Sequence, residues 1–204
     1  MRRFRRLPPA AALVAAAALA GCASAPTHFY TLRQSTSTNA DATAAPSPFL
    51  IEVMPVAVPA QVDQAEMLVR QSEQRVVILD NERWAAPLAA ELRGAFAADL
   101  AAALGTRDVY GLPRPPAAAV YRIQIDIRMF DSWPGRHALI DADWSIRGSA
   151  EGALITCSSR TTEDVGPGYD ALVQGHQRAI ARIAADIAAT VRSVAAGTAA
   201  ACPQ

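Results

Sequence analysis

Lysine is absent from this chain of 204 residues, and all 19 of its basic residues are arginine. A phosphate loop that binds ATP ends in Gly-Lys followed by Ser or Thr, so the sequence has no site of this class. Cysteine and histidine are also scarce, with three of each. They lack the paired spacing of zinc ligands, which argues against a metal site and predicts no cofactor.

The sequence also has no apolar run long enough for an ordinary membrane-spanning helix. Such a helix needs about 20 apolar residues, and the apolar run over 7–20 is shorter and contains Pro8 and Pro9. Four basic residues precede this run, namely Arg2, Arg3, Arg5 and Arg6. A charged start, a short apolar middle and a small-residue end are typical of a secretory signal peptide.

The signal ends in Leu19-Ala20-Gly21-Cys22, which resembles a bacterial lipobox. In a lipobox the cysteine is acylated, for example with palmitate, and the chain is cut just before it. We therefore expect residues 1–21 to be removed and Cys22 to carry the lipid, although an ordinary signal with a chance cysteine is the alternative. Several acyl chains anchor stably because each buried methylene contributes roughly 0.8 kcal/mol. Ala23 follows Cys22, and by resemblance to bacterial lipoproteins this predicts the periplasmic face of the outer membrane.

The mature chain has the length of one domain. Removing residues 1–21 leaves 204 − 21 = 183 residues, enough for one core. We predict a lipidated tether over 22–27, a single domain over 28–196 and a C-terminal tail over 197–204. The leader takes four arginines with it, so the formal net charge becomes 15 − 19 = −4. No basic patch remains that would indicate nucleic-acid binding.

Alternating apolar and polar residues predict a mostly antiparallel sheet. The expected strands cover 28–33, 49–58, 67–71, 75–79, 120–130, 138–146 and 153–162. In the strand over 120–130, one apolar face holds Tyr121, Ile123, Ile125, Ile127 and Met129. Residues 131–135 are expected to form the turn that follows.

Two stretches have the period of an amphipathic helix. The first opens within 80–88, with Asp80 or Asn81 as the cap and Pro87 in the first turn. Its apolar stripe consists of Leu88, Leu92, Phe96, Leu100 and Leu104, and Gly105 ends it. The second runs from Tyr169 to Val194 with His176 on its apolar stripe. Two such helices on one sheet face make a two-layer α+β sandwich.

A few side chains are candidates for chemistry or contact. Cys157 and Cys202 either form a disulfide or are a core residue and a tail residue, and the sequence leaves both readings open. Trp133, beside Pro134 at a turn, is a candidate contact for a partner or lipid. Asp131, Ser132 and His137 lie around one turn, but nothing there resembles a nucleophile elbow. We interpret that turn as a polar hairpin tip and His176 as a packed or hydrogen-bonded boundary residue.

Four sequence features occur together in the order of a known family. They are the lipobox, Phe29-Tyr30-Thr31-Leu32, Arg83-Trp84-Ala85-Ala86-Pro87-Leu88 and Gly168-Tyr169-Asp170-Ala171-Leu172-Val173. In this the chain resembles the ABC-type transport auxiliary lipoprotein family, the PqiC-like group, over nearly the whole mature sequence.

The resemblance implies a non-enzymatic outer-membrane lipoprotein that supports membrane integrity. Its partners would be an MCE-class periplasmic protein and an inner-membrane permease or ATPase, in a system that moves lipids between the two membranes. A homo-oligomeric ring is a further expectation. The alternative is an assembly lipoprotein that docks on, or chaperones, an outer-membrane barrel.

Overall fold

The computed structural model describes residues 25–34, 46–113, 115, 118–148, 154–198 and 202–203. Within these ranges it contains two helices and seven strands. The strands are β1 (His28–Tyr30), β2 (Phe49–Val53), β3 (Glu66–Ser72), β4 (Arg75–Trp84), β5 (Ala119–Trp133), β6 (His137–Arg147) and β7 (Ile155–Asp164). The helices are α2 (Leu88–Leu104) and α3 (Tyr169–Ala195). The predicted signal peptide over 1–21 and the lipidation site Cys22 lie outside the described residues.

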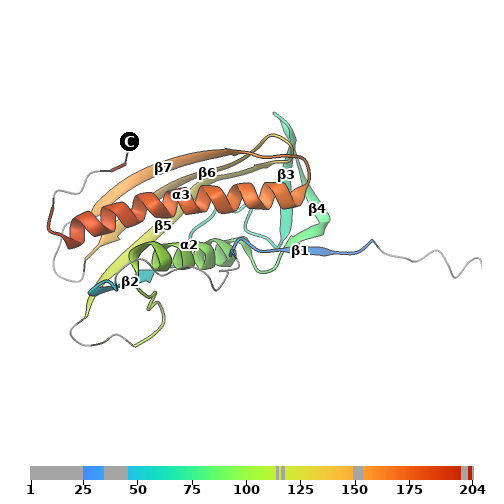
Figure 1. Ribbon diagram of the computed structural model, residues 1–204. Coiled ribbons are helices and arrows are strands. Elements are labelled where there is room, and N and C mark those ends of the chain that lie inside the picture. Colours follow the sequence, from blue (N-terminus) through green and yellow to red (C-terminus); the bar gives the residue numbers. More distant parts are fainter. Residues whose placement is uncertain are drawn as a thin grey trace, which may run out of the picture.

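The strands form two sheets. The larger has the order β2-β5-β6-β7 and the smaller the order β1-β4-β3. The pairs β3–β4, β5–β6 and β6–β7 are antiparallel, whereas β1–β4 and β2–β5 are parallel. Figure 1 shows the smaller sheet at one end of the molecule, across the ends of the long strands. The predicted α+β sandwich is confirmed, although its strands are divided between two sheets.

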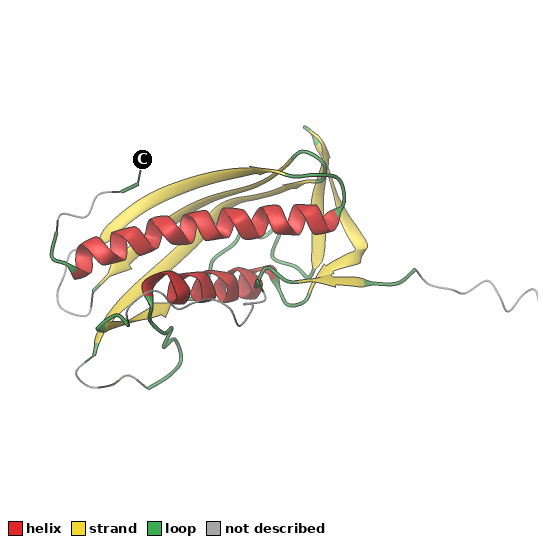
Figure 2. Ribbon diagram, viewed as in Figure 1, coloured by secondary structure: helices red, strands yellow, loops and turns green. Residues whose placement is uncertain are grey.

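Both helices lie along the larger sheet (Figure 2). The stripe of α3 that faces the sheet includes Ile180, Ile183, Ile187 and Val191, all fully buried. The other face of the sheet is polar, and Arg128 and Arg160 bind Asp141 there at 2.6 and 3.3 Å. A sheet with one apolar and one charged face can bury only one side, so both helices pack on the apolar side.

The predicted start of the first helix is wrong by several residues. Asp80 and Asn81 belong to β4, which continues to Trp84, and α2 begins at Leu88 with Pro87 as its N-cap. The reason is tertiary, because β1 pairs in parallel with residues 82–84 of β4 and holds them extended. The predicted end of this helix is confirmed, since Gly105 adopts a left-handed conformation with φ of 60°.

The face predicted for Met129 is also wrong. A β-bulge between Ile127 and Met129 shifts the register of β5 against β6. An extra residue in one strand reverses the facing of the residues that follow. As a result Met129 is 43% exposed, and Phe130 is buried instead. The same strand continues to Trp133, so the turn is shorter than predicted.

A glycine sets how closely α3 approaches β6. A methyl group at Gly175 would overlap Val165 Cγ1 and lie 2.9 Å from Ala138 Cβ. We predict that Gly175→Ala lowers the free energy of unfolding by about 1–3 kcal/mol, because the helix must move away from the sheet. Chemical denaturation measures this change.

Gly94 provides the matched control for this substitution, since it lies inside the other helix. A methyl group there meets only the flexible side chain of Arg33, 3.1 Å from Cδ. Gly94→Ala should therefore be neutral or stabilising, because alanine favours the helix. Equal destabilisation by both substitutions would contradict the packing argument.

Candidate functional site

The chain enters the domain through β1, which is held by the half-buried carboxylate of Glu82. Glu82 accepts a hydrogen bond of 2.7 Å from the Tyr30 hydroxyl and lies 3.0 Å from His28 Nδ1. Burial alone would raise the pKa of Glu82, but its bonds with Tyr30 and His28 outweigh this and lower it. These contacts fix the segment that follows the predicted tether.

A second carboxylate fixes the residues that follow β1. Glu91, in the first turn of α2, accepts hydrogen bonds from the Leu32 amide at 2.9 Å and the Thr31 hydroxyl at 2.7 Å. Leu32 itself is buried in the core. Gln177 of α3 also donates to the Thr31 carbonyl at 3.1 Å. The start of the domain is therefore bonded to the N-terminal parts of both helices.

Trp133 is half-buried within a cluster of charged side chains at the end of β5. The Arg136 guanidinium lies 3.8 Å from its ring centroid, and that of Arg70 lies 5.8 Å away. Arg70 also binds Asp131 at 2.8 Å, and Asp131 lies 3.0 Å from His137. The closeness of both guanidinium groups to the ring makes these cation–π contacts. The candidate contact residue thus presents part of its ring beside two guanidinium groups.

The structure separates the three hairpin residues that suggested catalysis. Asp131 is next to His137, but Ser132 makes its hydrogen bond with His176 of α3, at 2.8 Å. Ser132 and His176 are buried, at 4% and 0% exposure, and Phe130 stacks on the imidazole at 3.9 Å. His176 Nδ1 has no hydrogen-bond partner among the described residues. The Ser132–His176 pair is thus packed inside the core, away from Asp131 and His137.

Burial also determines the protonation of His176. It lowers the pKa of this side chain from 6.5 to about 3, with a smaller contribution from the charge of His137. The folded protein therefore keeps His176 neutral, while the unfolded chain binds a proton below pH 6.5.

This difference predicts an acid-sensitive fold. Because the folded pKa lies below the unfolded one, stability is fully present above pH 6.5 and is lost as pH falls. We expect His176 to account for a loss of about 2 kcal/mol of unfolding free energy between pH 7 and pH 5. Denaturation curves at both pH values measure it, with His176→Gln as the non-titrating comparison. An equal pH slope in the two proteins would refute the assignment.

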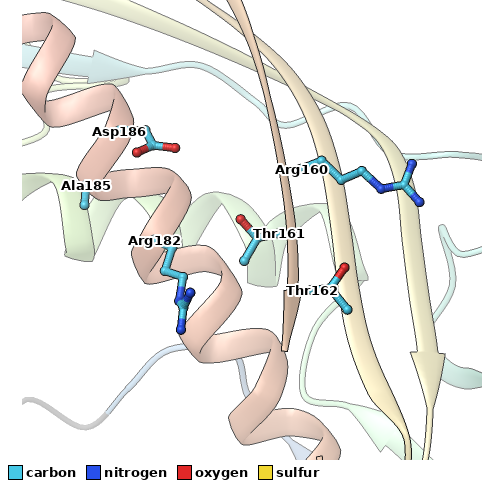
Figure 3. A pocket seen from close by; sticks show the side chains of 6 residues that line it. All are labelled: Arg160, Thr161, Thr162, Arg182, Ala185 and Asp186. Atoms are coloured by element: carbon cyan, nitrogen blue, oxygen red, sulfur yellow. The ribbon is translucent and has the colours of Figure 1, made fainter. Parts of the chain in front are cut away.

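A polar cleft lies between β7 and α3 (Figure 3). It measures about 620 Å³ and is lined by Arg160, Thr161, Thr162, Arg182, Ala185 and Asp186. Both of its arginines already face carboxylates, since Arg160 binds Asp141 at 3.3 Å and Arg182 binds Glu163 at 2.7 Å. The cleft therefore presents balanced charge.

A second hollow lies where β2, β5 and the C-terminal end of α3 meet. This groove measures about 490 Å³ and is mostly apolar, and we call it the apolar groove. Its lining consists of Pro48, Phe49, Ala119, Tyr121, Arg192, Ala195 and Ala196. Phe49 and Tyr121 pack edge to face, with centroids 5.1 Å apart. The groove lies at the end of the molecule opposite β1 (Figure 1).

Cys157 of β7 and Cys202 are joined by a disulfide, with Cα atoms 5.5 Å apart. Cys157 is buried beneath α3, whereas Cys202 is exposed. The bridge spans 45 residues of sequence and returns the chain from the end of α3 to the edge of the sheet.

Closing a loop of this length restricts the unfolded chain. We predict that Cys202→Ser lowers the free energy of unfolding by roughly 2–4 kcal/mol, as does reduction of the wild-type protein. Denaturation with and without a phosphine reductant measures both effects. A reductant effect that persists in Cys202→Ser would show that it does not act through this bridge.

Sequence reasoning missed the residues that are brought together across long distances. Nothing in the local sequence pattern indicates the bonds of Glu91 to Thr31 and Leu32. Arg192 was not singled out at all. No helix among the described residues is long and apolar enough to cross a membrane. The part of the chain that the structure describes contains no cluster of metal-ligating side chains.

Comparison with known proteins gives one family and several structures. The model of a family described as an ABC-type transport auxiliary lipoprotein component matches residues 30–188. A search of curated proteins gives no match.

Two solved structures share the fold at low sequence identity, and a third is similar at a TM-score below 0.5. An uncharacterised protein has a TM-score of 0.64 at 22% identity, over 82% of this chain and 99% of its own. A protein from Xanthomonas campestris has a TM-score of 0.60 at 14% identity, over 83% and 98%. A PelC dodecamer from Paraburkholderia phytofirmans has a TM-score of 0.40 at 11% identity, over 70% and 91%.

Proposed function

This chain belongs to the ABC-type transport auxiliary lipoprotein family, and from that premise we propose a non-enzymatic outer-membrane subunit of an MCE-type lipid transporter. In this proposal Cys22 carries the acyl anchor and the domain faces the periplasm. The protein docks at the outer end of a path formed by an MCE-class protein and an inner-membrane permease or ATPase. The family match carries the proposal.

The way the chain enters the domain supports anchoring close to a membrane. His28 lies six positions after Cys22, and six residues at full extension span about 20 Å. The next residues are fixed by the bonds of Glu82 and Glu91. A lipid on Cys22 would therefore hold the end of the molecule that contains the smaller sheet near the bilayer.

We assign partner contact to surfaces near this anchored end. Phe29, Val76 and Ile78 of the smaller sheet are 65%, 47% and 49% exposed. Trp133, with Arg70 and Arg136 beside its ring, adds an aromatic side chain and two cations. Aromatic and arginine side chains dominate the energetics of protein interfaces. A second copy of the chain, as in a ring, is a further occupant of these surfaces.

A crosslinked pull-down of the lipidated protein from its native membranes tests the proposal. Mass spectrometry should identify an MCE-class protein together with a permease or ATPase, and Cys22→Ser should weaken or abolish this recovery. Recovery of an outer-membrane barrel alone would reject the transport role in favour of the assembly-lipoprotein alternative.

The proposed partner contact of Trp133 is tested by a substitution in the same pull-down. Trp133→Ala should reduce partner recovery several-fold while leaving the anchor in place, because a central aromatic commonly contributes 2 kcal/mol or more. Met129→Ala is the matched control, since Met129 is 43% exposed on the charged face of the larger sheet. Equal recovery with both variants would remove Trp133 from the interface.

A further inference from the structure

The polar cleft and the apolar groove differ in whether their arginines are paired with carboxylates. Both arginines of the polar cleft face a carboxylate, and Asp186 adds a negative charge to its lining. In the apolar groove, Arg192 donates a hydrogen bond of 2.9 Å to the Ala103 carbonyl. No ion pair of Arg192 with a carboxylate exists among the described residues. The groove therefore presents one uncompensated cation beside apolar walls.

The walls of the groove come from three segments that are far apart in sequence. Pro48 and Phe49 come from the start of β2, Ala119 and Tyr121 from the start of β5, and Ala195 and Ala196 from the end of α3. The bond to Ala103, at the end of α2, holds the Arg192 guanidinium at the side of this groove. Its remaining N–H groups stay available, because a guanidinium carries five donors.

We propose that the apolar groove binds one acyl chain of an anionic amphiphile, with Arg192 at the charged head. Burial of the chain against Phe49 and Tyr121 removes its methylene groups from water, and the guanidinium matches a carboxylate or phosphate. The volume of about 490 Å³ lies within the range of small-ligand sites. That this amphiphile is the transported lipid rests on the proposed function. That the groove can bind it is argued from the residues of the groove.

The groove lies far from β1, so lipid labelling there distinguishes binding in the groove from contact with a nearby bilayer surface. Gln177 of α3 bonds to Thr31, next to β1, so the N-terminal part of α3 lies at the anchored end. With a rise of 1.5 Å per residue, Ala185 lies about 12 Å and Ala196 about 28 Å along the helix from Gln177. A membrane held near β1 would meet Ala185 before Ala196.

The experiment places the photocrosslinker p-benzoylphenylalanine at Ala196 or at Ala185 of the full lipidated chain in its native membranes. Both alanines are exposed on α3, and each lines one hollow. After irradiation, mass spectrometry measures lipid adducts. We expect at least fivefold more adduct from Ala196 than from Ala185. Equal labelling, or more from Ala185, would overturn the proposal, because it would indicate contact with the bilayer surface.

The role of the cation is tested by substitution. Arg192→Gln should reduce adducts of anionic lipid at Ala196 about tenfold, as expected for loss of a charge-assisted contact. Added palmitate should compete for the site, and the neutral monopalmitoylglycerol should compete less well. If added palmitate does not displace phospholipid adducts, the head group that Arg192 contacts is a phosphate. Arg182→Gln in the polar cleft is the control and should leave the adducts unchanged.

Other occupants give different results. Protein adducts to a second copy at Ala196, without lipid, would make the groove an interface between copies and overturn the proposal. Unchanged lipid labelling in Arg192→Gln would also overturn it. Neither result depends on the pull-down, so loss of the MCE partner with retained lipid adducts would reject the transport role alone.

Discussion

The rest of the structure depends on the packing of α3 against the apolar face of the larger sheet. Ile180, Ile183 and Ile187 are fully buried there, and Gly175 allows the helix to approach Ala138 and Val165. Burial of each such side chain contributes on the order of 1.5–3 kcal/mol. Once α3 is placed, its N-terminal part meets β1 and its C-terminal end meets β2 and β5. The end of the domain that contains β1 and the apolar groove therefore lie at opposite ends of one helix.

This arrangement gives the molecule a direction that suits the proposed role. Glu82 and Glu91 fix the entry of the chain at the end that carries Trp133 and the exposed residues of the smaller sheet. The groove with Arg192 lies at the other end. In the proposed transporter the first end faces the outer membrane, and the second faces the periplasm, where a lipid would arrive from a partner. In this proposal the length of α3 separates the attachment from the lipid contact.

The sequence predicted the helices and strands better than the contacts between them. The apolar stripes of α2 and α3, the helix end at Gly105 and the β3–β4 hairpin could all be read from local spacing. The start of α2 could not, because residues 82–84 are held in β4 by pairing with β1, 54 positions earlier. Met129 was misplaced because a bulge reverses strand facing without any change in the alternating pattern.

The sequence by itself determined the α+β class, the amphipathic faces and the pattern that predicts a lipid anchor. The class and the faces follow from the periodicity that backbone geometry imposes over a few residues. The predicted anchor follows from a short motif. The tertiary structure alone decided that Ser132 pairs with His176, that the strands divide into two sheets, and that Arg192 joins Phe49 and Tyr121 around a groove. The Ser132–His176 pair and the groove around Arg192 join segments more than 40 residues apart, and only the packing of whole elements brings such segments together.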